Sequence, residues 1–206
     1  MLIRKYVYLA VALVALVSGV NAENVAMVPM TGPTTQNLPA DLMLPHSDGA
    51  APKGRAWPAT RFALDGSGNC IIDKLTGLMW LRDGSKVNNG NAMNQADSFD
   101  YVRQGNWCGY SDWRVPNINE MRSLINYTTE VPAVWLMVGT GVNADDPHCD
   151  GACFTNIKWA GTNDMYLTST TEHLDQLRVY MVNLETGGMQ GYKAMAGYVL
   201  PVRGGK

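Results

Sequence analysis

The sequence predicts an α+β domain that contains two helices, a small antiparallel sheet and a long irregular loop region. Short strand-like runs separated by glycine turns occur over residues 61–81 and again over 166–203. Two amphipathic helical stretches lie between these runs. Residues 131–165 show little periodicity, and so long a loop inside a compact domain is typical of a functional segment.

The N-terminus has the features of a bacterial secretory signal peptide. Arg4 and Lys5 precede an apolar run, and small residues end at Ala22, where we expect cleavage. The apolar run is short for a transmembrane span, and no later segment is apolar enough to cross a bilayer. We therefore assign residues 1–22 to a signal peptide and expect a secreted, periplasmic or cell-surface protein without a transmembrane segment.

The rest of the chain divides into an arm and one domain. Residues 23–56 contain recurring prolines without periodicity, which predicts an extended arm or linker. Residues 57–206 are long enough to form one domain with its own core. Loss of the signal peptide would change the formal charge from −2 to −4, because it removes two cations. This acidic balance argues against a nucleic-acid-binding protein.

The first half of the domain is predicted to form a hairpin, a strand and a helix. The turn at residues 65–68 separates two short runs and indicates the hairpin. The next strand covers 78–81, and its Trp80 is interpreted as a core residue. Apolar residues at spacings of three and four predict an amphipathic helix over about 92–104.

An acid, an aromatic residue and a base follow one another at Asp112, Trp113 and Arg114. Such a group could be an acid–base site, or it could hold a strand to the helix that follows. If 112–115 is a short strand, Trp113 and Val115 lie on one face and the charged residues on the other. The position at a strand–helix junction favours the structural interpretation.

The second helix is predicted to begin after Asn117. Asn117 is the N-cap, and Glu120, three residues later, completes a pair that resembles a capping box. Both residues are therefore given structural roles. The domain is then predicted to close with an antiparallel meander of strands over 166–171, 176–184, 189–193 and 197–203.

Four cysteines, an even number in an exported protein, indicate two disulfides. The favoured pairs are Cys70 with Cys108 and Cys149 with Cys153. The alternative for Cys149 and Cys153 is a metal-binding or redox pair.

Two groups of loop residues are candidates for binding. Oxygen-bearing side chains gather between residues 143 and 150, and hard oxygen ligands favour Ca²⁺, although the spacing is not that of an EF-hand. The alternative is a solvated acidic loop, so no cofactor is certain. The Ca²⁺ candidates are Asn143, Asp145, Asp146 and Asp150.

The second group combines an aromatic side chain with amides and charges, a mixture that carbohydrate sites use. It consists of Asn156, Lys158, Trp159, Asn163 and Asp164. Trp159 could equally be a buried residue beneath the loop.

Several motifs, taken in order, resemble those of the Lcl C-terminal domain, which is named after a collagen-like bacterial adhesin. The motifs are TGLMW, GYSDWRVPNINEMRSLI, YLTSTT and YVLPVRGG, and the resemblance covers residues 61–205. It implies a C-type-lectin-like fold in which an irregular loop region carries binding. The sequence departs from the family pattern at Leu167, where tryptophan is typical, and at Val115, where leucine is common. No collagen-like repeat precedes the domain.

We therefore expect a secreted, non-catalytic, adhesin-like binding module. Its partner would be an extracellular glycan or a surface protein, bound through the 131–165 loop region. The alternative is a structural subunit of a surface filament or cell-envelope assembly, in which the chain binds copies of itself.

Overall fold

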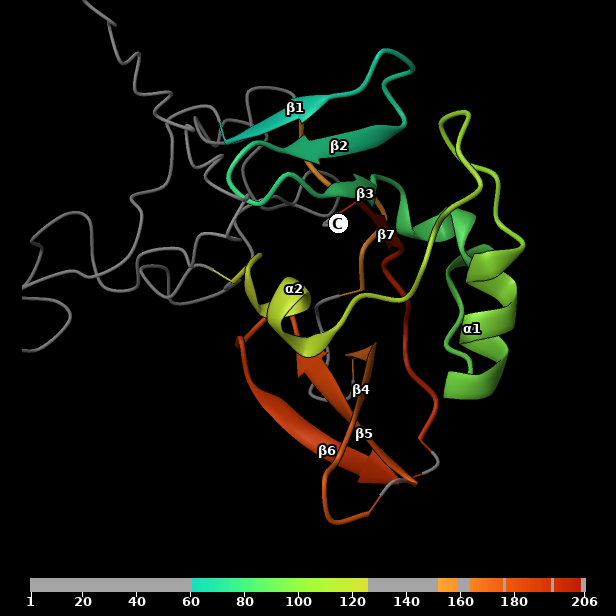
Figure 1. Ribbon diagram of the computed structural model, residues 1–206, viewed down its shortest axis with the longest axis vertical. Coiled ribbons are helices and arrows are strands. Elements are labelled where there is room, and N and C mark those ends of the chain that lie inside the picture. Colours follow the sequence, from blue (N-terminus) through green and yellow to red (C-terminus); the bar gives the residue numbers. More distant parts are fainter. Residues whose placement is uncertain (1–60, 126–151, 159–163, 176, 194, 205–206) are drawn as a thin grey trace, which may run out of the picture.

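The computed structural model describes residues 61–125, 152–158, 164–175, 177–193 and 195–204. The predicted signal peptide and arm lie outside these residues. The described chain is α+β, with two small antiparallel sheets placed at opposite ends of the view in Figure 1. The strand orders are β1-β2-β3-β7 and β4-β5-β6.

The first sheet contains the predicted hairpin. Its strands are β1 (Phe62–Leu64), β2 (Cys70–Asp73), β3 (Met79–Leu81) and β7 (Val202–Arg203). In the β1–β2 turn, the Asp65 carboxylate accepts hydrogen bonds from the backbone N–H groups of Ser67 and Cys70, at 3.1 and 2.9 Å. These bonds stabilise the hairpin turn, as expected of an aspartate that opens a turn.

A buried ion pair fixes the start of the sheet. The Arg61 guanidinium donates to both carboxylate oxygens of Asp73, at 2.8 and 2.5 Å, and to the carbonyl of Ser123 at 2.9 Å. Asp73 also accepts from the Leu75 N–H and the Thr76 hydroxyl. The first sheet is thereby tied to the end of the second helix by hydrogen-bonded charges.

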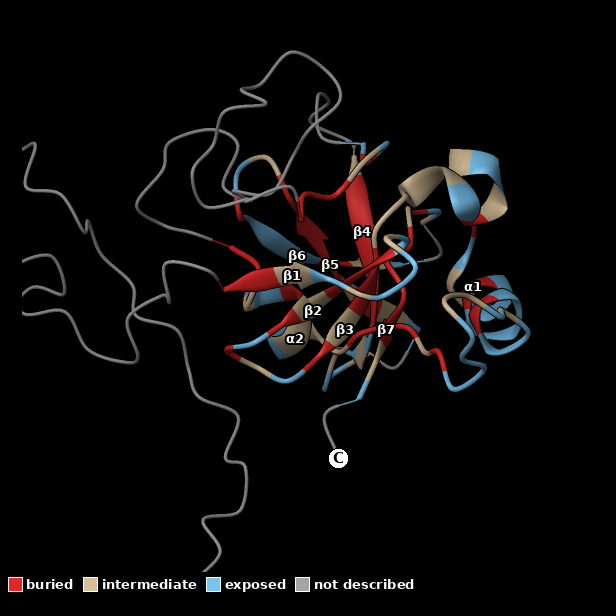
Figure 2. Ribbon diagram, turned by 90° about the horizontal axis from the view of Figure 1, so that it is seen from above, coloured by how far each residue is buried: buried red, intermediate tan, exposed pale blue. Residues whose placement is uncertain are grey.

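The helical segments are short. They are the 3₁₀ turns η2 (Gly84–Lys86) and η3 (Asn88–Gly90) and the helices α1 (Gln95–Arg103) and α2 (Ile118–Arg122). The helix predicted from residue 92 begins only at 95, because the Asn94 side chain accepts from the Asp97 N–H and caps it there. Most of the outer face of α1 is exposed (Figure 2).

The second sheet contains β4 (Met165–Thr171), β5 (Arg178–Asn183) and β6 (Met189–Lys193). The prediction that the last strand continues this meander is wrong, because β7 pairs with β3 of the first sheet. Val199 and Leu200 are adjacent and both buried. Because adjacent side chains of this segment point to opposite sides and both are buried, the segment lies between the two sheets and not at the edge of one of them.

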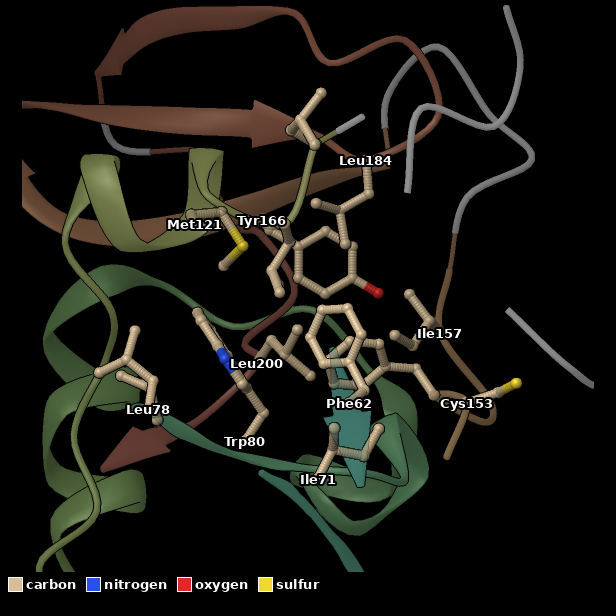
Figure 3. Packing of buried hydrophobic residues seen from close by; sticks show 14 of the residues in the cluster. Phe62, Ile71, Leu78, Trp80, Met121, Cys153, Ile157, Tyr166, Leu184 and Leu200 are labelled. Carbon is tan, nitrogen blue, oxygen red and sulfur yellow. The ribbon is translucent and has the colours of Figure 1, made fainter. Parts of the chain in front are cut away.

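Residues of both sheets build one core, with α2 packed against β4 and β5. Figure 3 shows Trp80 and Leu200 facing Met121 and Tyr166 within this cluster. Trp80 is fully buried, as predicted. Met121 of α2 is buried, and so are Leu124 and Ile125, which follow the helix.

Candidate functional site

The acid–aromatic–base group was the first candidate, and its tryptophan has a structural role. The Trp113 indole N–H donates to the carbonyls of Trp107 and Tyr110, at 3.1 and 3.0 Å. It thereby closes a tight turn in which Cys108 and Gly109 have φ of 55° and 79°. Cys108 is bonded to Cys70, so the turn is covalently tied to β2.

Residues 112–115 do not form the predicted strand, and only an isolated bridge joins Arg114 to Val202. Arg114 and Glu120 connect this segment and the start of α2 to the C-terminal segment. The Arg114 guanidinium donates to both Glu120 oxygens, at 2.7 and 2.6 Å, and to the carbonyl of Gly204 at 2.9 Å. The bond to Glu120 raises the pKa of Arg114 against the opposing effect of burial. Glu120 also accepts from the Asn117 N–H, while Asn117 accepts from the Glu120 N–H, so the predicted capping box is present.

Asp112 is held from the opposite end of the sequence. Arg203 donates to its two carboxylate oxygens at 2.7 and 3.2 Å and stacks on the Tyr110 ring, 3.6 Å from the centroid. The hydrogen bond to Asp112 raises the pKa of Arg203. Each charged group of the Asp112–Arg114 stretch therefore stabilises the packing of the C-terminal strand, and the structural interpretation of this stretch agrees with the geometry.

The loop candidates begin on a segment attached to β3. Residues 152–158 run beside 82–84, with a parallel bridge between Asp83 and Thr155. The Gly84 N–H donates to the Thr155 carbonyl at 2.9 Å, and the Thr155 N–H donates to the Arg82 carbonyl at 2.9 Å. A Cβ at Gly84 would lie 2.7 Å from the Asn156 carbonyl oxygen. The close approach of the two backbones therefore requires glycine.

Asn156 is fixed in an uncommon conformation by Asp83. Asn156 has φ of 53°, in the left-handed region that asparagine tolerates best among residues with a Cβ. Its side-chain amide donates to the Asp83 carboxylate at 2.9 Å. Burial acts to raise the pKa of Asp83, but hydrogen bonds from Ser85 and Asn156 outweigh it and leave the pKa lowered. The carboxylate thus stays ionised and orients the Asn156 side chain.

Two tyrosines lie beneath the next candidates. The Lys158 backbone N–H donates to the Tyr166 hydroxyl at 2.8 Å. Tyr166 packs against Tyr198, with ring centroids 5.8 Å apart and a tilt of 42°. Partial burial and the nearby carboxylate of Asp164 together raise the pKa of Tyr198.

These side chains border a small pocket that opens to solvent. Its enclosed part has room for about one water molecule. The lining residues are Gly84, Val87, Gly90, Asn91, Asn156, Lys158, Tyr166, Tyr198 and Val199. The pocket thus lies between the η2–η3 turns, the 152–158 segment and the C-terminal segment that joins the sheets.

The structure therefore brings together part of the predicted ligand group. Asn156 and Lys158 line one pocket, and Asp164 lies near Tyr198, which also lines it. Trp159 and Asn163 lie outside the described residues, as do all four Ca²⁺ candidates, Asn143, Asp145, Asp146 and Asp150. The calcium prediction stays untested.

Sequence reasoning did not select Asn91, Tyr166 or Tyr198 for this pocket. Tyr166 and Tyr198 lie in strand-like apolar runs, which indicate core positions. Their pairing joins strands that are not adjacent in the chain. The cluster of asparagines over residues 88–94 was the available signal, since asparagine favours the left-handed turns seen at Asn88 and Asn89.

The cysteines form disulfides as far as the described residues reach. The predicted Cys70–Cys108 bond is confirmed. Cys153 is also disulfide-bonded, while its predicted partner Cys149 lies outside the described residues. Asp65 lies close to Cys70 and Cys108. Both sulfurs are already bonded to each other, so these three residues do not offer the thiolate ligands that a metal site needs.

Together these features define a disulfide-bonded α+β domain, in which residues of two sheets share the core. The chain belongs to the Lcl C-terminal domain family, whose sequence model matches residues 69–203. No curated protein matches the chain. Among the described residues, no helix is both long enough and apolar enough to cross a membrane.

Proposed function

We propose that the chain is an exported, non-catalytic binding module with a C-type-lectin-like fold. Its adhesin-like role would be to bind an extracellular glycan or surface protein through the 131–165 loop region. Membership of the Lcl C-terminal domain family supports this role. The Cys70–Cys108 disulfide supports an oxidising, extracytoplasmic location.

One observation carries the proposal: two of the loop candidates line one pocket, and a third lies beside it. Asn156 is oriented by Asp83, Lys158 follows it on the same segment, and Asp164 lies near Tyr198 in the pocket wall. Polar groups presented around a pocket by a rigid framework are the usual arrangement of a ligand site on loops.

The hydrogen bonding of the acid and base groups around residues 112–120 supports a non-catalytic role for this stretch. Asp112, Arg114 and Glu120 are engaged in bidentate pairs that link the helix to the C-terminal strand. A general acid or base needs a proton that a substrate can reach. Groups committed to structural pairs do not offer one.

The test is binding of the chain without its signal peptide to a panel of neutral and sulfated glycans, with Ca²⁺ and with a chelator. Binding lost with the chelator would support both the module and the predicted calcium cluster. Binding retained with the chelator would support the module without the metal. A panel with no binding at all would count against glycan recognition.

A matched pair of variants locates the binding surface. Lys158→Ala removes a cation from the pocket wall, whereas Lys74→Ala removes an exposed cation from the β2–β3 turn of the first sheet. Binding should weaken only in Lys158→Ala. Equal effects of the two variants would indicate general charge attraction rather than a site.

The second candidate function is a structural subunit of a surface assembly, favoured by the β4–β5 hairpin. Leu174 and Leu177 at its tip are 88% and 69% exposed. Glu172 pairs with Arg178 at 2.8 Å and Asp175 with Lys193 at 3.7 Å, which orders the tip and leaves its charges balanced. Two exposed leucines on an ordered, neutral tip suit burial in another protein surface.

Light scattering over a concentration series distinguishes this candidate. Assembly that disappears in Leu174→Ser with Leu177→Ser, but persists in Met189→Ser, would favour the structural subunit. Met189 is a suitable control because it is half exposed on β6 and lies at the opposite end of the β5–β6 hairpin from Lys193. A monomer at all concentrations would argue against self-assembly.

A further inference from the structure

The Tyr166 hydroxyl has an unused proton. A phenol both donates and accepts hydrogen bonds, and this one accepts from the Lys158 N–H. Within the described residues, no group accepts the Tyr166 proton. The side chain is only 2% exposed, so bulk water does not freely solvate it. In Figure 3 the hydroxyl points toward Ile157.

Tyr166 is one of the residues that line the small pocket described above, and its hydroxyl is bonded to Lys158, which also lines it. The enclosed space accepts a group about the size of one water molecule. A single hydroxyl oxygen of a ligand has this size and can accept the Tyr166 proton. A buried polar group costs free energy unless its hydrogen bonds are made. A ligand that places an acceptor oxygen beside the Tyr166 hydroxyl would make the missing bond and so bind more tightly.

The remaining lining groups set the chemistry of the rest of the ligand. The Tyr198 ring and the side chains of Val87 and Val199 offer apolar surface, while Asn91 and Asn156 offer amides. Charges of both signs border the pocket, since Lys158 lines it and Asp164 lies near Tyr198. The pocket therefore does not select a ligand by the sign of its charge, and its amides and apolar surface suit an uncharged ligand.

An uncharged molecule with one apolar face and projecting hydroxyls is a neutral sugar. We propose that this pocket is a sugar subsite in which Tyr166 donates to a hydroxyl oxygen of an uncharged sugar ring. The Tyr198 ring covers the apolar face of that sugar. This inference rests on the proposed binding function and names the ligand class of the same surface.

The first measurement uses defined probes: a series of neutral methyl hexosides, with glucuronate and glucosamine as anionic and cationic comparators. Binding to the chain without its signal peptide is followed by NMR shifts. We expect saturable binding of a neutral hexoside in the millimolar range, with shifts at Asn91, Asn156 and Tyr198. A charged comparator that binds more tightly than every neutral hexoside would overturn the proposal.

The second measurement uses Tyr166→Phe, which keeps the buried ring and removes only the hydroxyl. Affinity should fall by about 3- to 10-fold, the value of one hydrogen bond. Tyr180→Phe on β5 is the matched control and should bind like the unaltered chain. Unchanged affinity in Tyr166→Phe would overturn the proposal.

Because Tyr166→Phe also removes the acceptor of the Lys158 N–H, a structural loosening must be separated from a lost ligand contact. Deoxy hexosides that each lack one hydroxyl make this separation. One deoxy sugar should bind the unaltered chain with the same reduced affinity that the parent sugar shows for Tyr166→Phe. The affinity of Tyr166→Phe for that deoxy sugar should be no lower than its affinity for the parent sugar. Additive losses for every deoxy sugar would overturn the direct contact.

The two proposals fail differently. Binding on the glycan panel together with no response to neutral hexosides would retain the binding module and reject this subsite. Hexoside binding that is unaffected by Tyr166→Phe would also reject it. An absence of binding in both measurements would reject glycan recognition and the subsite together.

Discussion

Glu120 links three parts of the chain through one carboxylate. It accepts from the Asn117 N–H at the start of α2, forms two bonds with Arg114, and through Arg114 is connected to the Gly204 carbonyl. The capping relation with Asn117 could be predicted because it is local in sequence. The partner of Asp112, by contrast, is Arg203, which lies 91 residues away in the sequence. The alternation of side chains predicted the face on which Asp112 lies, but it could not identify this distant partner.

Replacing Glu120 with alanine should lower the free energy of unfolding by about 2 kcal/mol, because the change removes half of the capping box and the charged partner of Arg114. Chemical denaturation measures this effect. The control is Arg103→Ala, which breaks an ion pair with Asp100. The Arg103 and Asp100 side chains are 75% and 66% exposed. That loss should stay below about 0.5 kcal/mol. Equal losses would contradict the role assigned to Glu120.

Asp83 should contribute acid-sensitive stability. Its pKa is lowered in the folded chain, so its contribution is present above the unfolded pKa of about 3.9 and is lost as the pH falls through the folded pKa. Asp83→Asn keeps a capping side chain but cannot ionise. The variant should be less stable than the unaltered chain near pH 6, by less than about 1 kcal/mol, and the difference should shrink in acid.

Urea unfolding at neutral and acidic pH checks the Asp83 prediction. Asn156→Ala provides an internal comparison, since it removes one of the hydrogen bonds that lower the Asp83 pKa. Its loss of stability on acidification should be smaller than that of the unaltered chain. A difference between Asp83→Asn and the unaltered chain that is constant with pH would show that the charge of Asp83 is not responsible.

At the scale of elements, the C-terminal segment could not be placed from its sequence alone. The run GYVLPVR indicates a strand, and strands near one another in the chain usually pair. In the structure this segment is hydrogen-bonded to both sheets. The Tyr198 carbonyl accepts from the Leu167 N–H of β4, and the Pro201 carbonyl accepts from the Leu81 N–H of β3. The segment lies between the sheets because its side chains are buried on both faces. Such burial depends on tertiary packing, which the sequence of the segment alone does not reveal.

Gly197 is the point at which this segment approaches its neighbours most closely. A Cβ there would lie 2.8 Å from the Met165 carbonyl oxygen and 3.0 Å from the Leu167 Cγ. Gly197→Ala should therefore lower the free energy of unfolding by about 1–3 kcal/mol through overpacking. Gly66→Ala is the control, because nothing lies within 4 Å of its Cβ position. Chemical denaturation should show little change in the control; a similar loss in both variants would contradict the close approach.

At the scale of the whole molecule, the two sheets should unfold as one unit. Both core clusters contain residues from each sheet: Trp80 and Val182 share one, and Leu81 and Met181 share the other. The C-terminal segment is bonded to both sheets, and α2 packs against the second while its end is held by Arg61 of the first. Neither sheet has a core that would remain if the other opened.

Native-state hydrogen exchange tests this cooperativity, because the Leu81 and Leu167 amides both donate to carbonyls of the shared segment, at 3.1 and 2.8 Å. If the sheets open together, the two amides should exchange with the same free energy, close to that of global unfolding. Gly197→Ala should lower both values equally, although the atoms that its Cβ would meet all belong to the second sheet. Exchange at Leu167 that becomes faster while Leu81 stays protected would show that β4–β6 opens as a separate unit and that the shared segment does not couple the sheets.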